Sequence, residues 1–153
     1  MIKINWFGNV NRVDELVNIF LNNTGIEYIT HIEIEEGRAL SINEWSPNLK
    51  DILRDELITE MAKSKVIVAE DDGIIKGYAL LKLENKILTI EDIVVNQKGI
   101  GTEIMEWIEK EMVKNGIKRL MADLGVKNKR AQEFMKKLGY EAQTIVYVKN
   151  INK

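Results

Sequence analysis

The chain has 153 residues, of which 45% are hydrophobic and 30% are charged, and this balance predicts a single globular domain over residues 1–153. Its formal net charge of −2 argues against a dedicated nucleic-acid-binding protein. It contains no cysteine, which excludes a disulfide framework, a thiol nucleophile and a cysteine-ligated zinc site. No apolar run approaches the roughly 20 residues of a transmembrane helix, and the first residues lack the apolar segment of a signal peptide, so we expect a cytoplasmic protein without a membrane partner.

The charges are distributed unevenly along the chain. Residues 1–95 carry 10 basic and 17 acidic residues, whereas residues 96–153 carry 12 basic and 7 acidic ones. An ordinary solvated surface is compatible with this asymmetry. So is a protein whose first half meets a cationic molecule while its second half meets a polyanion.

The first part of the chain is predicted to hold one strand and two helices. Residues 1–7 form an opening strand, and residues 13–23 have apolar side chains at helical spacing after a candidate N-cap, Asn11. A second helix is predicted to enter at Ser46-Pro47 and run to residue 64. Between them, residues 28–36 alternate like a strand but also suit a long loop. The acids at 32–36 are expected to be solvated, with recognition of a cation as the alternative.

After residue 64 the apolar period changes from helical to alternating, which predicts a meander of three strands. Its segments are 65–70, 74–84 and 87–95, and Asp72-Gly73 suits a tight hairpin turn between the first two. The elements expected next are a helix at 101–116, a strand at 117–126, a short helix at 129–140 and a final strand at 141–151. This order predicts an α/β (α+β) fold, in which a mixed, mostly antiparallel central sheet is flanked by about four helices.

A glycine-containing turn joins the third strand of the meander to the following helix. Gly99 and Gly101 allow positive φ angles and would leave backbone N–H groups free at the helix N-terminus, where an anion is stabilised. Lys98 adds a cation. The third glycine of the dinucleotide fingerprint and the Gly-Lys-Ser/Thr of a P-loop are both absent. This turn alone therefore leaves a structural and a phosphate-binding interpretation open.

The meander, the glycine turn and the later segment "NKRAQEFMKKLGY" (128–140) together resemble the GCN5-related N-acetyltransferase (GNAT) family. The resemblance covers roughly residues 64–148 by motif and implies the acyl-CoA N-acyltransferase fold, with acetyl-CoA (coenzyme A) as cofactor. It implies that strand backbone pairs with pantetheine, that the glycine turn holds the pyrophosphate, and that the later helix contacts the cofactor arm. The positions that it implies for cofactor binding are Ile93, Val94, Val95, Lys98, Gly99, Ile100, Gly101, Thr102, Asn128, Ala131 and Phe134.

Two positions depart from the family pattern. The approach to the glycines, "NQK" (96–98), is shorter than in most members and has Asn96 where arginine or glutamine is usual. Met135 stands where many members have the tyrosine that protonates the leaving thiolate, and a thioether has no proton to donate. The thiolate would then take its proton from Tyr140 or from water, or it would have no specific proton donor.

Two acids, Glu91 and Asp92, interrupt the otherwise apolar strand that precedes the glycine turn. Acids are costly there unless paired or solvated, so a salt-bridged acid beside an exposed one is one interpretation. The other is catalytic, because an amine must lose a proton before it attacks a thioester and a tuned carboxylate can accept that proton. Since strand side chains alternate, we expect at most one of the two to face the substrate. Glu-Asp before an apolar triplet resembles the polyamine acetyltransferases of the family, which implies Glu91 as the base.

The sequence thus predicts an N-acetyltransferase that moves acetyl from acetyl-CoA to a primary amine by direct attack. The acceptor expected is a small-molecule amine, such as a cationic or polyamine-like one, or a peptide amine. The alternative, favoured by the short loop and Met135, is a non-catalytic module of the same fold that binds CoA or a protein partner. The single histidine, His31, gives no basis for a metal site, so no metal is expected, and a homodimer is compatible with the family resemblance.

Overall fold

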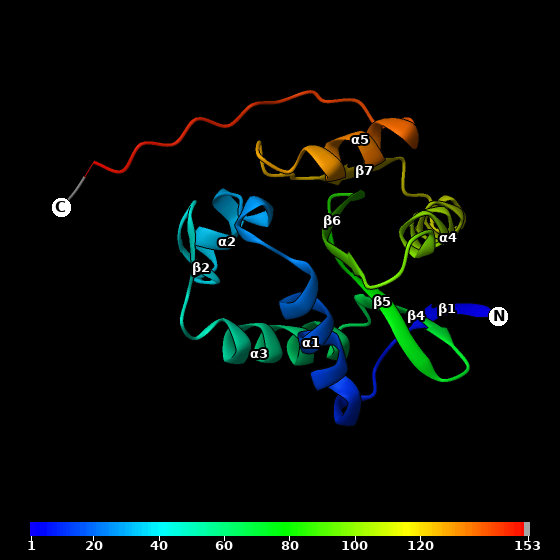
Figure 1. The fold of residues 1–153 in the computed structure, drawn as a ribbon. Coiled ribbons are helices and arrows are strands. Elements are labelled where there is room, and N and C mark those ends of the chain that lie inside the picture. Colours follow the sequence, from blue (N-terminus) through cyan, green and yellow to red (C-terminus); the bar gives the residue numbers. More distant parts are fainter. Residues whose placement is uncertain (152–153) are drawn as a thin grey trace.

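Five strands form one mixed sheet with the order β1-β4-β5-β6-β7 in the computed structural model, which describes residues 1–151 (Figure 1). All neighbouring strands are antiparallel except β6 and β7, which are parallel and therefore need the crossover helix that joins them. The strands are β1 (Ile2–Trp6), β4 (Val66–Asp71), β5 (Ile74–Glu84), β6 (Ile87–Val95) and β7 (Arg119–Ala122).

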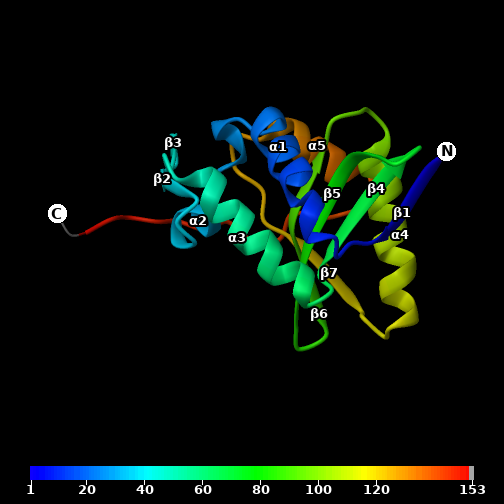
Figure 2. The same ribbon diagram turned by 90° about the horizontal axis from the view of Figure 1, so that it is seen from below.

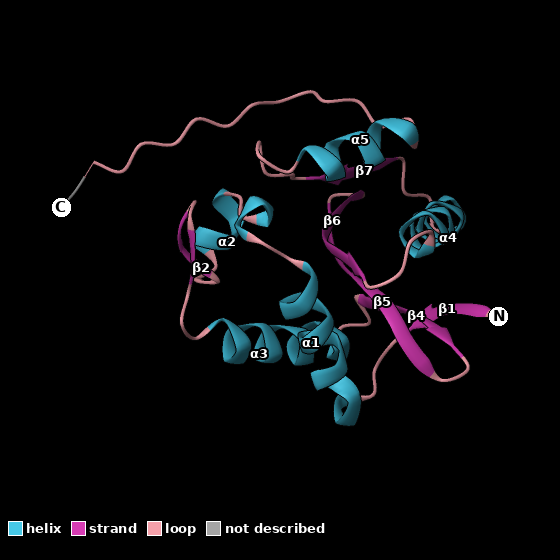
Figure 3. Cartoon of the chain, in the orientation of Figure 1, coloured by secondary structure: helices cyan, strands magenta, loops and turns pink. Residues whose placement is uncertain are grey.

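Helices cover both faces of this sheet (Figures 2 and 3). On one face lie α1 (Val13–Asn23) and α3 (Leu49–Ala62), and on the other lie α4 (Ile100–Lys114) and α5 (Lys129–Lys137). The shorter elements are η1 (Val10–Arg12), η2 (Ile26–Tyr28), α2 (His31–Glu35) and the hairpin of β2 (Ala39–Ser41) and β3 (Glu44–Trp45). Within residues 1–151, none of the helices combines the length and the apolar character that a membrane crossing requires.

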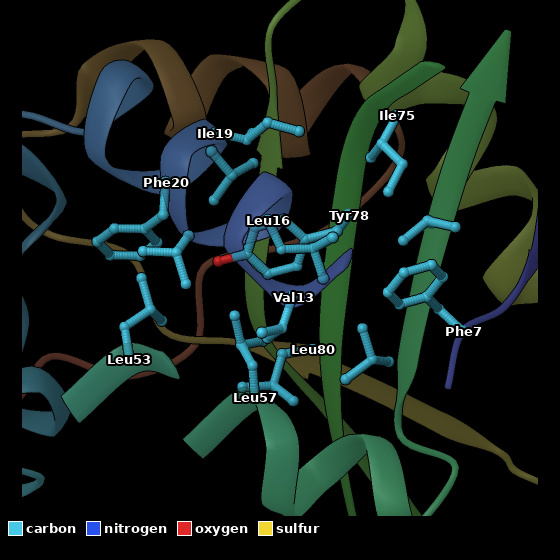
Figure 4. Close-up of a cluster of buried hydrophobic side chains, with 14 of the residues drawn as sticks. Phe7, Val13, Leu16, Ile19, Phe20, Leu53, Leu57, Ile75, Tyr78 and Leu80 are labelled. Atoms are coloured by element: carbon cyan, nitrogen blue, oxygen red, sulfur yellow. The ribbon is translucent and has the colours of Figure 1, made fainter. Parts of the chain in front are cut away.

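The pleat of the strands divides the buried side chains into two cores. In β5, Tyr78 and Leu80 point toward α1 and α3, whereas Ala79 and Leu81 point toward α4. Figure 4 shows the first core, where Leu16 of α1 and Leu57 of α3 meet the side chains of β5. The sheet thus lies between two helical layers. Successive side chains of a strand contact opposite layers, because they point to opposite faces of the sheet.

The predicted order of strands and helices is confirmed up to the end of α5, but the segment at 28–36 is different. It contains the helix α2 and no strand. Thr30 and Glu33 form a capping box there: the Thr30 hydroxyl accepts from the N–H of Ile32 at 3.1 Å, and the Glu33 carboxylate accepts from the N–H of Thr30 at 2.7 Å. Thr-x-x-Glu is a helix-start signal, and here it outweighs the alternation.

The strand predicted at 141–151 does not form. These residues have no helical or strand structure, and they lead away from the sheet in an extended course (Figure 1). Alternating apolar residues become a strand only where a neighbouring edge supplies hydrogen bonds, and β7 does not pair with them. The candidate N-cap Asn11 is also wrong, because η1 precedes α1 and moves the cap to Arg12.

Leu57→Ala should lower the free energy of unfolding by about 2–5 kcal/mol, because the fully buried side chain would leave a cavity between α3 and the sheet. Leu40→Ala is the matched control: Leu40 lies in β2 and is 58% exposed, so we expect a loss below about 0.5 kcal/mol. Urea unfolding of both variants measures the difference. Equal losses would contradict the assignment of the first core.

Candidate active site

The strands β6 and β7 separate halfway along β6. They pair from Ile87 with Arg119 to Ile90 with Ala122, where β7 ends. Within residues 1–151, the backbone of the second half of β6, residues 91–95, is paired with no strand other than β5. Its other edge therefore offers unpaired backbone groups, which can pair with an extended ligand as a further strand would. We call this place the fork.

A β-bulge lies at the fork. Leu80 pairs with Asp92 and Leu81 pairs with Ile90, so Glu91 is the extra residue in β6. The bulge shifts the alternation by one residue: Ile90 belongs to the core under α4, whereas Val94 belongs to the core under α1. As a result, Glu91 and Asp92 both reach the polar groups beneath α2 and α3. The regular alternation on which we based the expectation for these two acids therefore does not hold here, although Glu91 alone of the two lines the pocket described below.

Asp92 is fully buried and its carboxylate is completely engaged. Arg38 donates to both of its oxygens, each at 2.9 Å, and the Tyr28 hydroxyl donates to Oδ1 at 3.0 Å. Arg38 also donates from Nε to Glu56 of α3 at 2.9 Å. Burial lowers the pKa of Arg38, but the adjacent carboxylates of Asp92 and Glu56 more than reverse this and hold it above its usual range. Asp92 thus joins the segment after α2 to the sheet.

In contrast to Asp92, Glu91 has few donors around its carboxylate. Its side chain is only 5% exposed, and neither carboxylate oxygen has a hydrogen-bond partner among residues 1–151. The ammonium of Lys82 on β5 lies 3.0 Å from Oε2 and forms an ion pair with it, and it also donates to Glu36 at 2.9 Å. Glu91 is therefore a buried carboxylate whose oxygens remain available to another donor.

The neighbours of Glu91 change its acidity. Carboxylate oxygens of Glu36, Glu56 and Glu91 lie within 4.8 Å of one another, with Lys82 and Arg38 among them. Burial and the neighbouring Glu36 raise the pKa of Glu91 to about 8, against the opposing effect of Lys82. The pKa of Glu36 is lowered, because the interactions with Glu91 and Lys82 outweigh its burial. Of these two neighbours, Glu91 therefore binds a proton more readily than Glu36 does.

A pocket of about 250 Å³ opens beside Glu91, between α2 and the strands β5 and β6. The pocket contains five acidic side chains and one lysine, so its potential is negative and favours a cation. Its lining residues are Thr30, Ile32, Glu33, Glu36, Lys82, Glu84, Thr89, Ile90, Glu91 and Asp123.

The N-terminus of α4 follows the fork closely. Gly99 caps the helix with a φ of 92°, a left-handed conformation that favours glycine. The N–H groups of the first helical turn have no carbonyl partners within the helix, and the helix dipole makes this end attractive to anions. Lys98 is exposed next to the cap. The short connection at 96–99 therefore still presents a helix N-terminus, although it has few additional loop amides.

The helix α5 packs against this N-terminus. A Cβ atom added to Gly101 would lie 3.2 Å from the ring of Phe134, so the missing side chain allows the two helices to approach. The side chain of Asn128 accepts from the N–H of Ala131 at 3.2 Å and caps α5. The predicted cofactor positions on α5 thus lie at its start and on the side that faces α4.

No free acid for the leaving thiolate is found at the two candidate positions. Met135 is buried in the core under α4. The Tyr140 hydroxyl donates to Glu109 of α4 at 3.1 Å, and burial and this carboxylate raise the pKa of Tyr140. The single histidine, His31, lies at the start of α2, with its Nδ1 3.5 Å from Oε2 of Glu35.

Sequence reasoning missed the basic residues that organise the site, Arg38 and Lys82, and the acid Glu36. Lys82 had a detectable signal, because it interrupts the apolar run "YALLKLE" of a strand that is otherwise buried. Glu36 was noticed only as one of the acids at 32–36 expected to be solvated, and Arg38 had no signal, since it follows the weakly patterned segment around α2. Glu33, expected to be solvated, is instead buried by its role in the capping box.

Comparisons with known proteins identify the family and the fold. The model of the acetyltransferase (GNAT) family matches residues 26–140. A search of curated protein sequences finds no match.

Solved structures with a similar fold include the PaiA N-acetyltransferase from Thermoplasma acidophilum in complex with coenzyme A (TM-score 0.70, 17% identity, covering 94% of this chain and 91% of that one). They also include the ribosomal-protein-S18-alanine N-acetyltransferase from Escherichia coli (TM-score 0.65, 17% identity, 94% and 80% covered). A third is an aminoglycoside N-acetyltransferase in complex with CoA (TM-score 0.64, 15% identity, 99% and 96% covered). At these identities the likeness concerns the fold.

Arg38→Met should destabilise the protein by about 3–5 kcal/mol, because it leaves Asp92 buried without its charged partner. Arg54→Met is the matched control, since Arg54 forms an exposed ion pair with Asp14 and its loss should cost below about 1 kcal/mol. Thermal and urea unfolding compare the two. If Arg38→Met were as stable as Arg54→Met, the buried pair would not hold the site together.

Proposed function

Because the chain belongs to the GCN5-related N-acetyltransferase family, we propose that it transfers the acetyl group of acetyl-CoA to the primary amine of a cationic small molecule, with Glu91 as the general base. The observation that carries this proposal is the state of Glu91. It is a buried carboxylate that is paired with Lys82 at 3.0 Å, has no further hydrogen-bond donor among residues 1–151, and is located where β6 and β7 separate. A buried carboxylate that has only the ammonium of Lys82 as a charged partner and lies beside further acids is costly for folding, and a proton-transfer role accounts for it.

The residues at the fork fit coenzyme A. The unpaired edge of β6 at Ile93, Val94 and Val95 can exchange hydrogen bonds with the amides of a pantetheine arm. The first turn of α4, with Gly99, supplies N–H groups for a pyrophosphate, and Lys98 supplies a positive charge. When bound, acetyl-CoA supplies an activated thioester.

The proton transfer follows from the acidity of Glu91. An amine that arrives as an ammonium ion has no lone pair, so it must lose a proton before it can attack a carbonyl carbon. In its ionised form Glu91 accepts that proton, and a pKa of about 8 suits a base that works near neutral pH. Lys82 keeps the carboxylate in place at 3.0 Å. The neutral amine then attacks directly, since the chain has no cysteine to carry the acetyl group.

The leaving thiolate needs no dedicated acid in this proposal. The thioether of Met135 cannot donate a proton, and the hydroxyl of Tyr140 is engaged with Glu109. A thiol has a pKa of about 8.5, so a thiolate released near neutral pH can take its proton from water.

The charge of the pocket supports a cationic acceptor. Glu84 and Asp123 line it together with Glu36 and Glu91, and among residues 1–151 Lys82 is the one basic residue that lines it. A primary ammonium would be attracted by this potential and would be directed toward the carboxylate that deprotonates it. A second amino group on the same molecule could pair with the remaining acids.

Glu91→Gln should reduce kcat by roughly 100- to 10,000-fold, because the amide cannot accept the proton of the ammonium. In the unmodified protein kcat/KM should rise with pH until about 8, since the raised pKa leaves Glu91 protonated and inactive below that value. Thiol release from acetyl-CoA over a panel of mono-, di- and polyamines measures both effects.

Glu106→Gln is the control for this experiment, because Glu106 is exposed on α4 and lies outside the pocket. A Glu91→Gln variant as active as Glu106→Gln would disprove the base assignment alone. Absence of thiol release with every amine, in a protein that binds CoA, would instead favour the non-catalytic alternative.

Lys98→Ala should weaken CoA binding by roughly 3- to 10-fold at low salt, because an exposed cation near a pyrophosphate contributes about 1 kcal/mol and is screened by ions. Lys110→Ala, on the exposed side of α4, is the control and should bind as the unmodified protein does. Isothermal titration calorimetry at low and high salt measures the affinities. Equal affinities of the two variants at low salt would remove Lys98 from the site.

A further inference from the structure

The pocket beside Glu91 contains a primary amine that belongs to the chain itself. Lys82 lies on β5, and its side chain lines the pocket. Its ammonium nitrogen lies 3.0 Å from Oε2 of Glu91 and 2.9 Å from Oε2 of Glu36. The proposed function requires an acceptor amine to come within hydrogen-bonding distance of the general base. Lys82 already meets this requirement.

The ammonium group of Lys82 is held without being enclosed. The side chain of Lys82 is 39% exposed, whereas that of Glu91 is only 5% exposed. A lysine nitrogen sits on a flexible four-carbon stem, so it can shift without any movement of the strand that carries it. The amine can therefore move toward a molecule bound at the fork while it stays close to Glu91.

Lys82 and the fork are neighbours in the sheet. Lys82 pairs with Thr89 of β6, and the bulged residue Glu91 follows two positions later. The edge of β6 that we propose for the pantetheine arm begins at the same bulge. The base, the chain's own amine and the proposed cofactor edge thus lie within a few residues of one another on two paired strands.

We propose that the enzyme acetylates its own Lys82 when no other amine occupies the pocket, an inference that rests on the proposed function. Glu91 accepts one proton from the ammonium, and the neutral nitrogen attacks the carbonyl carbon of acetyl-CoA. The new N–C bond forms as the C–S bond breaks. The nitrogen gives its second proton, through water, to the released thiolate. The products are acetylated Lys82, the thiol of CoA and a proton on Glu91.

Acetylation of Lys82 inhibits the enzyme in this proposal. The amide carries no charge, so Glu36 and Glu91 lose the cation that lies between them. Lys82 opposes the rise in the pKa of Glu91, and its neutralisation therefore leaves Glu91 more often protonated and unable to accept a proton. An acceptor amine that fills the pocket displaces Lys82 from the base and protects it. The enzyme would thus lose activity when acetyl-CoA is present without an acceptor.

Peptide mapping of the unmodified protein after incubation with isotope-labelled acetyl-CoA tests the proposal. We expect a single labelled acetyl group per chain, on Lys82, at a rate independent of protein concentration, and a saturating amine should suppress it. Burial lowers the pKa of Lys82, but the adjacent carboxylates of Glu36 and Glu91 more than reverse this and hold it above its usual range. Uncatalysed acetylation therefore favours other lysines, and selective labelling of Lys82 indicates catalysis by the site.

Two pairs of variants complete the experiment. Glu91→Gln should slow the labelling of Lys82 by roughly 100- to 10,000-fold, whereas Glu106→Gln, exposed on α4, should label as the unmodified protein does. Incubation with acetyl-CoA alone should reduce the activity of Lys76→Arg, since Lys76 lies on β5 outside the pocket. Lys82→Arg should keep its own starting activity under the same treatment, because a guanidinium is not acetylated.

The outcomes separate this proposal from the proposed function. Thiol release with amines but no label on Lys82 would overturn self-acetylation alone, as would equal labelling rates in Glu91→Gln and Glu106→Gln. Absence of both the label and thiol release, in a protein that binds CoA, would overturn the proposed function together with it.

Discussion

The bulge in β6 is the constraint on which the site depends. It places one extra residue opposite the bond between Leu80 and Leu81, and so turns two successive acids toward the same polar cluster. One of them, Asp92, is saturated by Arg38 and Tyr28, while the other, Glu91, keeps its oxygens free of hydrogen bonds. The same irregularity coincides with the end of β7, where β6 loses its partner on the outer edge. The proposed base and the proposed cofactor-binding edge therefore lie at one point of the sheet.

The charged groups around the bulge give the two neighbouring carboxylates, Glu91 and Asp92, different surroundings. Both are buried, but one is neutralised by a bidentate guanidinium and the other shares its surroundings with further acids. Burial beside Glu36 favours the protonated form of Glu91, and Lys82 prevents the shift from becoming so large that the base cannot ionise near neutral pH. Pairs of carboxylates whose environments differ in this way are a common arrangement for acid–base chemistry.

Much of the fold could be predicted from the sequence, since the spacing of apolar residues and the glycine turn predicted the strand meander before Gly99 and the helix after it. The capping box at Thr30 and Glu33 was a local signal that the alternation concealed. The bulge had no local signal, because the pairing register of β5 and β6 is a property of two strands together. The contacts of Arg38 with Asp92 and Glu56 likewise depend on tertiary packing. The prediction of a strand at 141–151 was wrong, because an alternating apolar pattern does not by itself supply a neighbouring strand to pair with.

The acidity of Glu91 is the most direct test of the proposed chemistry. Carbon-13 NMR of the side-chain carboxyls, with Glu91→Gln used to assign the resonance, gives its pKa in the free protein. The proposed mechanism predicts a pKa of about 8, which falls when Glu36 is changed to glutamine because that neighbour's negative charge is removed. A carboxyl that titrates near the ordinary value of 4.5 would contradict the buried base at the fork.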